Sequence, residues 1–153
     1  MRLTGGQIVA EYLAREKVPY FVGIPGHGCL GLVDAFVGRN DVRILQVRAE
    51  QAAVHLADGY YRACGRPLAC FTSIGPGTMN TAVGLATCYV DSTPCLVFIG
   101  DAHTYMSGKG VLQEVERRRD ADNLRALEPL AKRCWRVTEV GQLPGILART
   151  SSS

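Results

Sequence analysis

Short apolar runs alternate along this chain with stretches in which apolar residues recur every three or four positions. The runs predict buried strands and the recurring positions predict helices packed on them. Their regular exchange predicts an α/β fold of three layers, α/β/α, around a mostly parallel sheet. The predicted strands cover residues 20–22, 43–47, 68–72, 94–99 and 134–137. The predicted helices follow Thr4 and cover 30–37, 50–64, 79–90, 123–127 and 140–147.

Several of these elements carry a specific expectation about burial. The run 94–99 is continuously apolar, which is typical of a parallel strand buried on both faces, and 43–47 is likewise expected to be buried. The helix over 30–37 is expected to turn Leu30, Val33, Phe36 and Val37 inward. The helix over 79–90 carries an apolar stripe, and together with the helix that Glu50 opens it supplies more apolar surface than one small sheet is expected to cover. The stripe consists of Met79, Ala82, Val83, Ala86, Tyr89 and Val90.

Length and composition indicate one domain over residues 1–150, with 151–153 as a frayed tail. The net charge of +3 is small, and the basic run 117–119 lies between acidic residues, which argues against nucleic-acid binding and for a solvated face. Six cysteines without a CxxC pair favour reduced thiols over a zinc site or a disulfide framework. No signal peptide or membrane-length apolar run is evident, so a cytoplasmic location is expected. Residues 101–120 read as a functional or mobile loop.

Glu50 stands where a strand leads directly into a helix. In parallel α/β sheets, ligands bind beyond the carboxyl ends of the strands, so a glutamate at this junction is a candidate for proton transfer. The simpler interpretation is a glutamate in a first helical turn that complements the helix dipole and faces water. The local sequence leaves both open.

Two glycine turns follow strands. The turn over 26–31 fits the GxGxxG pattern of dinucleotide-binding sites, and Glu50 follows at about the distance of a ribose-binding acid, so an NAD-dependent oxidoreductase is one alternative. The turn Gly75-Pro76-Gly77 combines a fixed φ with two residues that lack side-chain bulk, which allows a flat ligand to approach the backbone closely.

Three motifs in order resemble a known family. They are the runs 47–60, 72–80 and 89–94, and they resemble the N-terminal pyrimidine-binding (PYR) domain of thiamine-diphosphate enzymes of the acetolactate synthase group. The sequence Ser73–Gly77 also resembles the corresponding segment of trihydroxycyclohexane-dione hydrolase, which belongs to the same superfamily. The likeness runs from Thr4 to about Leu147 and includes the run 112–115.

This resemblance implies a thiamine-diphosphate-binding fold in which Glu50 hydrogen-bonds the pyrimidine N1′ and favours the imino tautomer of the cofactor. By position, His27 and Gln113 would lie at the reacting end. The remaining cofactor-binding residues implied are Pro25, Gly26, Ser73, Pro76, Gly77 and Asn80.

The same resemblance implies partners. Family enzymes hold the diphosphate and its Mg²⁺ on a second domain, and the characteristic Gly-Asp-Gly of that domain is absent here, so no metal ligand is assigned to this chain. We therefore expect a half-site that needs a diphosphate-binding domain or subunit and is inactive alone. Its small-molecule substrate would be a 2-oxo acid or dione, and a homodimer or higher oligomer is expected. A non-catalytic regulatory subunit is the other alternative.

Overall fold

The computed structural model describes residues 2–115 and 122–151 of the chain. Four strands form one sheet in the order β2-β1-β3-β4, and every neighbouring pair is parallel. The predicted parallel α/β architecture is therefore confirmed. The strands are β1 (Tyr20–Gly23), β2 (Arg43–Gln46), β3 (Ala69–Thr72) and β4 (Leu96–Ile99).

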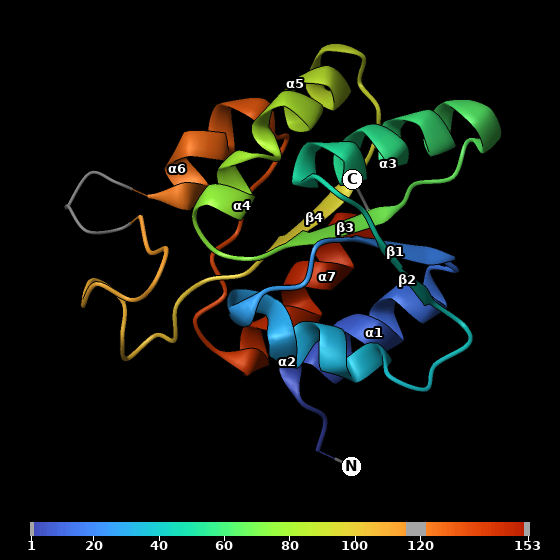
Figure 1. Ribbon diagram of the computed structural model, residues 1–153. Coiled ribbons are helices and arrows are strands. Elements are labelled where there is room, and N and C mark those ends of the chain that lie inside the picture. Colours follow the sequence, from blue (N-terminus) through green and yellow to red (C-terminus); the bar gives the residue numbers. More distant parts are fainter. Residues whose placement is uncertain (1, 116–121, 152–153) are drawn as a thin grey trace.

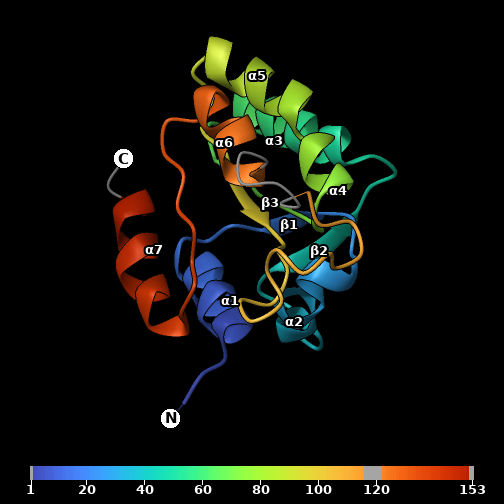
Figure 2. The same ribbon diagram turned by 90° about the vertical axis from the view of Figure 1, so that its left-hand side faces the viewer.

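Helices cover both faces of this sheet, as the three-layer prediction requires (Figures 1 and 2). One layer consists of α3 (Glu50–Cys64), α4 (Pro76–Met79), α5 (Ala82–Val90) and α6 (Asn123–Leu127). The other consists of α1 (Gly5–Arg15), α2 (Leu30–Val33) and α7 (Leu143–Ser151). Short 3₁₀ helices are η1 (His27–Cys29), η2 (Asp34–Phe36), η3 (Glu128–Leu130) and η4 (Val140–Gln142).

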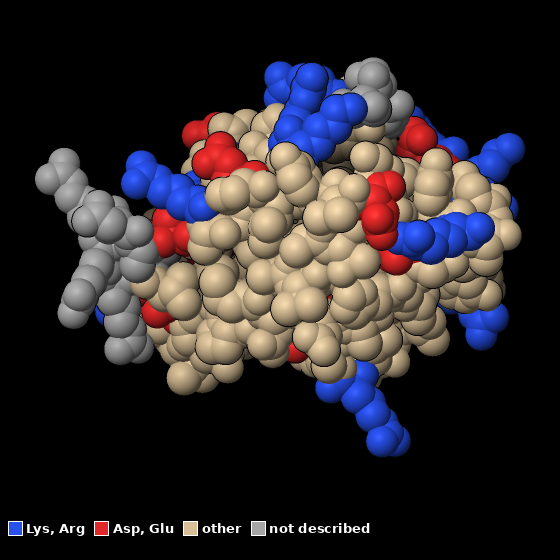
Figure 3. Space-filling model, turned by 90° about the horizontal axis from the view of Figure 1, so that it is seen from above, with Lys and Arg blue, Asp and Glu red and all other residues tan. Residues whose placement is uncertain are grey.

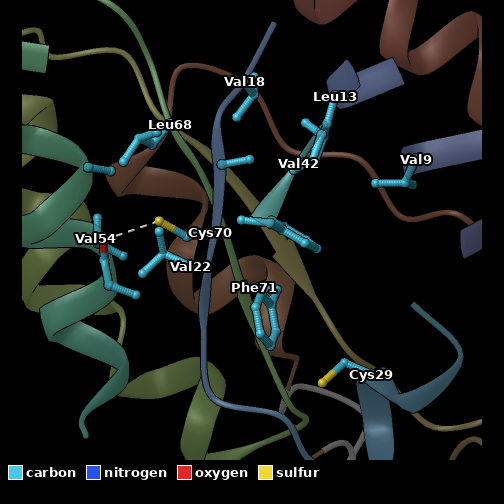
Figure 4. Packing of buried hydrophobic residues seen from close by; sticks show 14 of the residues in the cluster. Val9, Leu13, Val18, Val22, Cys29, Val42, Val54, Leu68, Cys70 and Phe71 are labelled. Carbon is cyan, nitrogen blue, oxygen red and sulfur yellow. Dashed lines mark hydrogen bonds between the residues drawn. The ribbon is translucent and has the colours of Figure 1, made fainter. Parts of the chain in front are cut away.

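The core lies on the two central strands. Phe21 of β1 is fully buried, and its ring contacts those of Phe36, Phe71 and Phe98 at centroid distances of 4.9, 4.7 and 5.5 Å. Figure 4 shows the neighbouring aliphatic side chains and Cys70, whose thiol donates to the carbonyl oxygen of Ala53 at 3.3 Å. Burial of these side chains stabilises the packing of the helices on the sheet, because apolar area removed from water contributes about 25 cal/mol per Å².

The burial predicted for β2 and for the helix over 30–37 was wrong. β2 is the edge strand beside β1, and Ile44 and Leu45 on it are exposed, because only one neighbouring strand lies beside it. The predicted helix over 30–37 is divided into α2 and η2, which follow η1. Phe36 is buried as expected, but Leu30 and Val37 face solvent, because the chain already turns to extended backbone at Val37.

The predicted strand over 134–137 is also absent. These residues have no strand partner in the described sheet, and together with β4 they line a cavity of about 270 Å³. A strand requires a hydrogen-bonded neighbour, and the apolar pattern alone does not supply one. For the same reason β4 is half-buried instead of buried on both faces.

Residues 101–115 contain no helix or strand, which confirms the predicted loop over that range. Residues 116–120, including the basic run 117–119, lie outside the described residues, as do 152–153 of the predicted tail. Among the described residues, no helix is both long and apolar enough to cross a membrane.

Candidate functional site

The sequence-predicted site lies where the strand order reverses. The chain passes from β1 to β2 on one side and then returns to β3 on the other side of β1, so the crevice beyond β1 and β3 is the switch point of the sheet. Ligands of open parallel sheets bind at such points. The connections that follow β1, β2 and β3 carry most of the predicted site residues.

Glu50 is the first residue of α3 and is half-buried. Ala49 before it is extended and has no side chain that could cap the helix, so the carboxylate is the acidic group of the first turn. That position complements the helix dipole. The carboxylate of Glu50 also contacts residues outside α3, so Glu50 is not the purely solvent-facing glutamate of the simpler interpretation.

Asn80 supplies the main contact of Glu50. Its Nδ2 donates to Oε2 of Glu50 at 3.0 Å. This bond joins the connection after β2 to the connection after β3. Since Oε2 has a donor from the protein, Oε1 is the oxygen that this bond leaves available to a ligand.

Gly77 makes room for the Glu50 carboxylate. A Cβ at Gly77 would lie 3.1 Å from Oε1 of Glu50 and 3.0 Å from Oγ1 of Thr72. Gly75 has a φ of 65°, and Pro76 occupies the first turn of α4, where its missing N–H has no cost. The turn therefore presents backbone without side-chain bulk beside the carboxylate.

Thr72 is a site residue that sequence reasoning missed. It ends β3, is fully buried, and its Oγ1 has no hydrogen-bond partner in the described part of the chain. A buried hydroxyl without a partner is costly and marks a place where a further polar group is expected. The available signal was a single polar residue at the end of the apolar run 68–71.

The turn after β1 packs against the turn after β3. A Cβ at Gly26 would lie 2.5 Å from Oγ of Ser73, and the Gly28 N–H donates to that oxygen at 3.3 Å. Cys29 lies beneath this turn, where burial raises the pKa of its thiol. Pro25, just before the turn, is exposed.

His27 and Gln113 are brought to the same edge by the loop over 101–115. The Nε2 atom of His27 lies 3.2 Å from the carbonyl oxygen of Leu112. A Cβ at Gly75 would lie 1.9 Å from the Gln113 carbonyl oxygen, so the loop rests directly on the turn after β3. The structure thus joins Glu50 to Gly77 and Asn80, Gly26 to Ser73, and the loop to His27.

The glycine turn over 26–31 differs from a dinucleotide site. It continues into a 3₁₀ helix and then into α2, which has only four residues. A Cβ at Gly28 would meet the side chain and backbone nitrogen of Ile74 at 3.1 Å, so protein already occupies that approach. A dinucleotide fingerprint needs a full helix whose N-terminus faces the phosphates.

Metal-binding side chains do not gather near the site. Within residues 2–115 and 122–151, no group of three or more histidine, cysteine, aspartate or glutamate side chains could hold a metal ion. The groups brought together at Glu50 are a carboxylate, a carboxamide, a hydroxyl and open backbone. That set offers hydrogen-bond donors and acceptors beside open backbone, and it can bind a flat, polar ring.

Comparison with known proteins identifies the family of the chain. Residues 3–122 match the family described as thiamine pyrophosphate enzyme, N-terminal TPP binding domain. The acetolactate synthase large subunit of Haemophilus influenzae is 32% identical over 148 residues, which are 97% of this chain and 25% of that protein. The acetolactate synthase isozyme 3 large subunit of Escherichia coli is 33% identical over 147 residues, 96% of this chain and 25% of that protein.

A probable acetolactate synthase large subunit of Methanococcus aeolicus is 34% identical over 144 residues, 94% of this chain and 23% of that protein. The chain thus spans about a quarter of the length of these relatives. Thiamine pyrophosphate and thiamine diphosphate are two names for one cofactor. With the family matched over residues 3–122, this chain belongs to the thiamine pyrophosphate enzymes, in the family of their N-terminal TPP binding domain.

Proposed function

We propose that this chain provides the pyrimidine-binding half of a thiamine-diphosphate site, in an enzyme that cleaves or forms a C–C bond of a 2-oxo acid or dione. The observation that carries the proposal is the Glu50 carboxylate, held by Asn80 and left open on the side of Gly77. The relatives are named as acetolactate synthases, which agrees with this reaction class.

The residues present fit the cofactor ring. Oε1 of Glu50 borders the space that a Cβ at Gly77 would fill, and the unpartnered Thr72 hydroxyl borders it too. In the proposed complex Glu50 shares a proton with a ring nitrogen, and Asn80 keeps the carboxylate in place. The turn at Pro76 and Gly77 lies along the ring.

The turn after β1 borders the other side of the proposed site. Pro25 and Gly26 belong to it, and Ser73 holds it through the Gly28 N–H. His27 of that turn contacts Leu112 of the loop over 101–115, and Gln113 of the same loop rests on Gly75 in the turn after β3. We assign His27 and Gln113 to the substrate side. When bound, the cofactor supplies a carbon nucleophile and an electron sink, whereas the protein orients and exchanges protons.

A diphosphate-binding domain or subunit completes the site in this proposal. The described residues offer no cluster that would hold Mg²⁺ beside two phosphates, so we assign the metal to that partner. The chain alone would then be inactive. We retain the cytoplasmic location expected from the sequence.

Self-association is the second part of the proposal. The outer layer of α3 and α5 presents a largely uncharged face that carries a few charged side chains (Figure 3). The exposed apolar side chains of α5 are Val83, Tyr89 and Val90. Such patches on a globular domain usually mark a contact, and a two-fold dimer is the commonest way to bury one.

The test is a chimera of the E. coli isozyme 3 large subunit in which this chain replaces its matched segment. Calorimetry should detect Mg²⁺-dependent binding of thiamine diphosphate and none of NAD, and a Glu50→Gln chimera should bind the cofactor more weakly. Binding of NAD alone would support the dinucleotide alternative. Cofactor binding without any turnover would support the regulatory-subunit alternative.

A further inference from the structure

The loop over 101–115 is folded around the side chain of Glu114. This side chain is almost fully buried, and its carboxylate accepts three backbone N–H groups, from Gly108 at 2.5 Å, Gly110 at 2.9 Å and Val111 at 3.1 Å. The Glu114 N–H in turn donates to the carbonyl oxygen of Val111 at 3.0 Å. Charge-assisted bonds of this kind are roughly twice as strong as neutral ones, so the carboxylate is the centre of the loop.

The backbone near Glu114 adopts conformations that need such support. Gly108 and Gly110 have φ values of 76° and 77°, and Gln113 has a φ of 63° although it carries a side chain. A residue other than glycine in the left-handed region is strained, because its Cβ lies too close to the following carbonyl oxygen. The bonds to Glu114 on one side, and the Gly75 contact on the other, hold Gln113 in this conformation.

The folded loop positions the carbonyl oxygens of two of its residues. The Gln113 oxygen rests on Gly75, and the Leu112 oxygen lies 3.2 Å from Nε2 of His27. Both residues immediately precede Glu114 in the sequence. The hydrogen bonds of Glu114 described above all lie within the loop, so they reach His27 through the position of Leu112.

A carbonyl oxygen only accepts hydrogen bonds, so the ring nitrogen that faces Leu112 must carry the proton. Neutral His27 is then the Nε2–H tautomer, and Nδ1 is left as an acceptor. We propose that Glu114 is a positioning residue: it holds Leu112 against His27 and thereby selects the tautomer and orientation of that imidazole. Its relevance to catalysis rests on the proposed function, which places His27 on the substrate side.

A carboxylate is required because three donors converge on it. Glutamine at this position keeps one carbonyl oxygen, but its NH₂ group would face N–H groups that need acceptors. The Glu114→Gln chain should therefore keep the fold of the two helical layers and lose the compact loop. A matched control is Glu128→Gln, which removes the same charge from an exposed position on η3.

The experiment uses the 153-residue chain, labelled with ¹⁵N, without cofactor or partner. Hydrogen exchange should show the amides of Gly108, Gly110 and Val111 exchanging on the order of tenfold faster or more in Glu114→Gln. At about pH 8.5, where an ordinary imidazole is neutral, the ring ¹⁵N shifts of His27 should move toward the values of a tautomer mixture. The ring shifts of His55, on α3, should stay unchanged.

A second variant tests the same proposal, so that the result does not depend on Glu114→Gln alone. Gly110→Ala keeps Glu114 but places a side chain at a φ of 77°, where it is strained, and open space surrounds that position. It should alter the same amides and the same His27 shifts. Unchanged His27 shifts in both variants would overturn the proposal, even if the loop amides exchange faster. Because no cofactor is present, this outcome is independent of whether the chain binds thiamine diphosphate.

Discussion

Asn80 Nδ2 donates to Glu50 Oε2 at 3.0 Å, although the two residues are 30 positions apart. Glu50 follows β2 and Asn80 follows β3, and β1 lies between these strands in the sheet. The bond therefore spans the switch point of the fold. It holds one carboxylate oxygen and leaves the other beside Gly77.

Replacing Glu50 by glutamine tests the proposed proton role. Glu50→Gln keeps the size of the side chain and removes the proton that the carboxyl would share with the cofactor ring. In the E. coli chimera, exchange of the cofactor C2 proton, followed by NMR, should slow by roughly 10²–10⁴-fold, which is the usual worth of a positioned acid–base group. Exchange at the original rate would remove Glu50 from the mechanism.

Replacing Asn80 by alanine tests the positioning of Glu50. The carboxylate would lose its donor, and a hydrogen bond at a partly exposed site is worth about 1 kcal/mol, so C2-proton exchange in the chimera should slow roughly fivefold. Asn40→Ala, which alters an exposed asparagine before β2, is the control. Equal rates for Asn80→Ala and the unaltered chimera would contradict the assigned role.

Gly77→Ala tests the space beside Glu50. The added methyl group would meet Oγ1 of Thr72 and Oε1 of Glu50 at 3.0 and 3.1 Å, so the carboxylate must shift. Affinity of the chimera for thiamine diphosphate, measured by calorimetry, should fall by roughly tenfold, which corresponds to about 1.4 kcal/mol.

Gly59→Ala serves as the control for Gly77→Ala. It places a methyl group on α3 where nothing lies within 4 Å. Alanine is favoured over glycine inside a helix, so this variant should be more stable by roughly 0.5–1 kcal/mol and bind the cofactor normally. A normal affinity of Gly77→Ala would show that this space is not part of the cofactor site.

The predicted dimer can be tested on the isolated chain. Val90 on α5 is 78% exposed, and Val90→Asp places a charge in the uncharged face of α3 and α5. Sedimentation at tens of micromolar should report a dimer for the unaltered chain and a monomer for Val90→Asp. Val37→Asp is the matched control, because Val37 is equally exposed and follows η2 in the other layer. An unaltered chain that sediments as a monomer would exclude the dimer.

The lowered pKa of Asp58 predicts how the stability of the fold depends on pH. Hydrogen bonds from Arg62 and then Thr93 lower the pKa of Asp58. A carboxyl whose pKa is lower in the folded state stabilises the fold above its unfolded pKa, and that stabilisation is lost as the pH falls through the folded value. Denaturant unfolding should therefore show a loss of stability below about pH 4 that is smaller in Asp58→Asn. The same slope in both chains would contradict this assignment.

The sequence predicted the local features of the fold correctly but not a feature that depends on contacts between distant residues. The order of strands and helices followed from the sequence, because the spacing of apolar residues reflects the local geometry of each element. The position of Glu50 at the start of α3 followed for the same reason. The strand expected over 134–137 did not form, because strand formation depends on a hydrogen-bonding neighbour that no local pattern specifies.

Within the site, the sequence by itself determined which chemistry was available: a carboxylate, a turn without side-chain bulk and, by resemblance, their assignment to a cofactor ring. Only the tertiary structure decided that Asn80 holds Glu50, that the Thr72 hydroxyl is buried without a partner, and that Glu114 folds the loop beside His27. These relationships join residues on different elements. They depend on how the strands are ordered and how the loops pack, and both are set by the burial of the whole core rather than by neighbours in sequence.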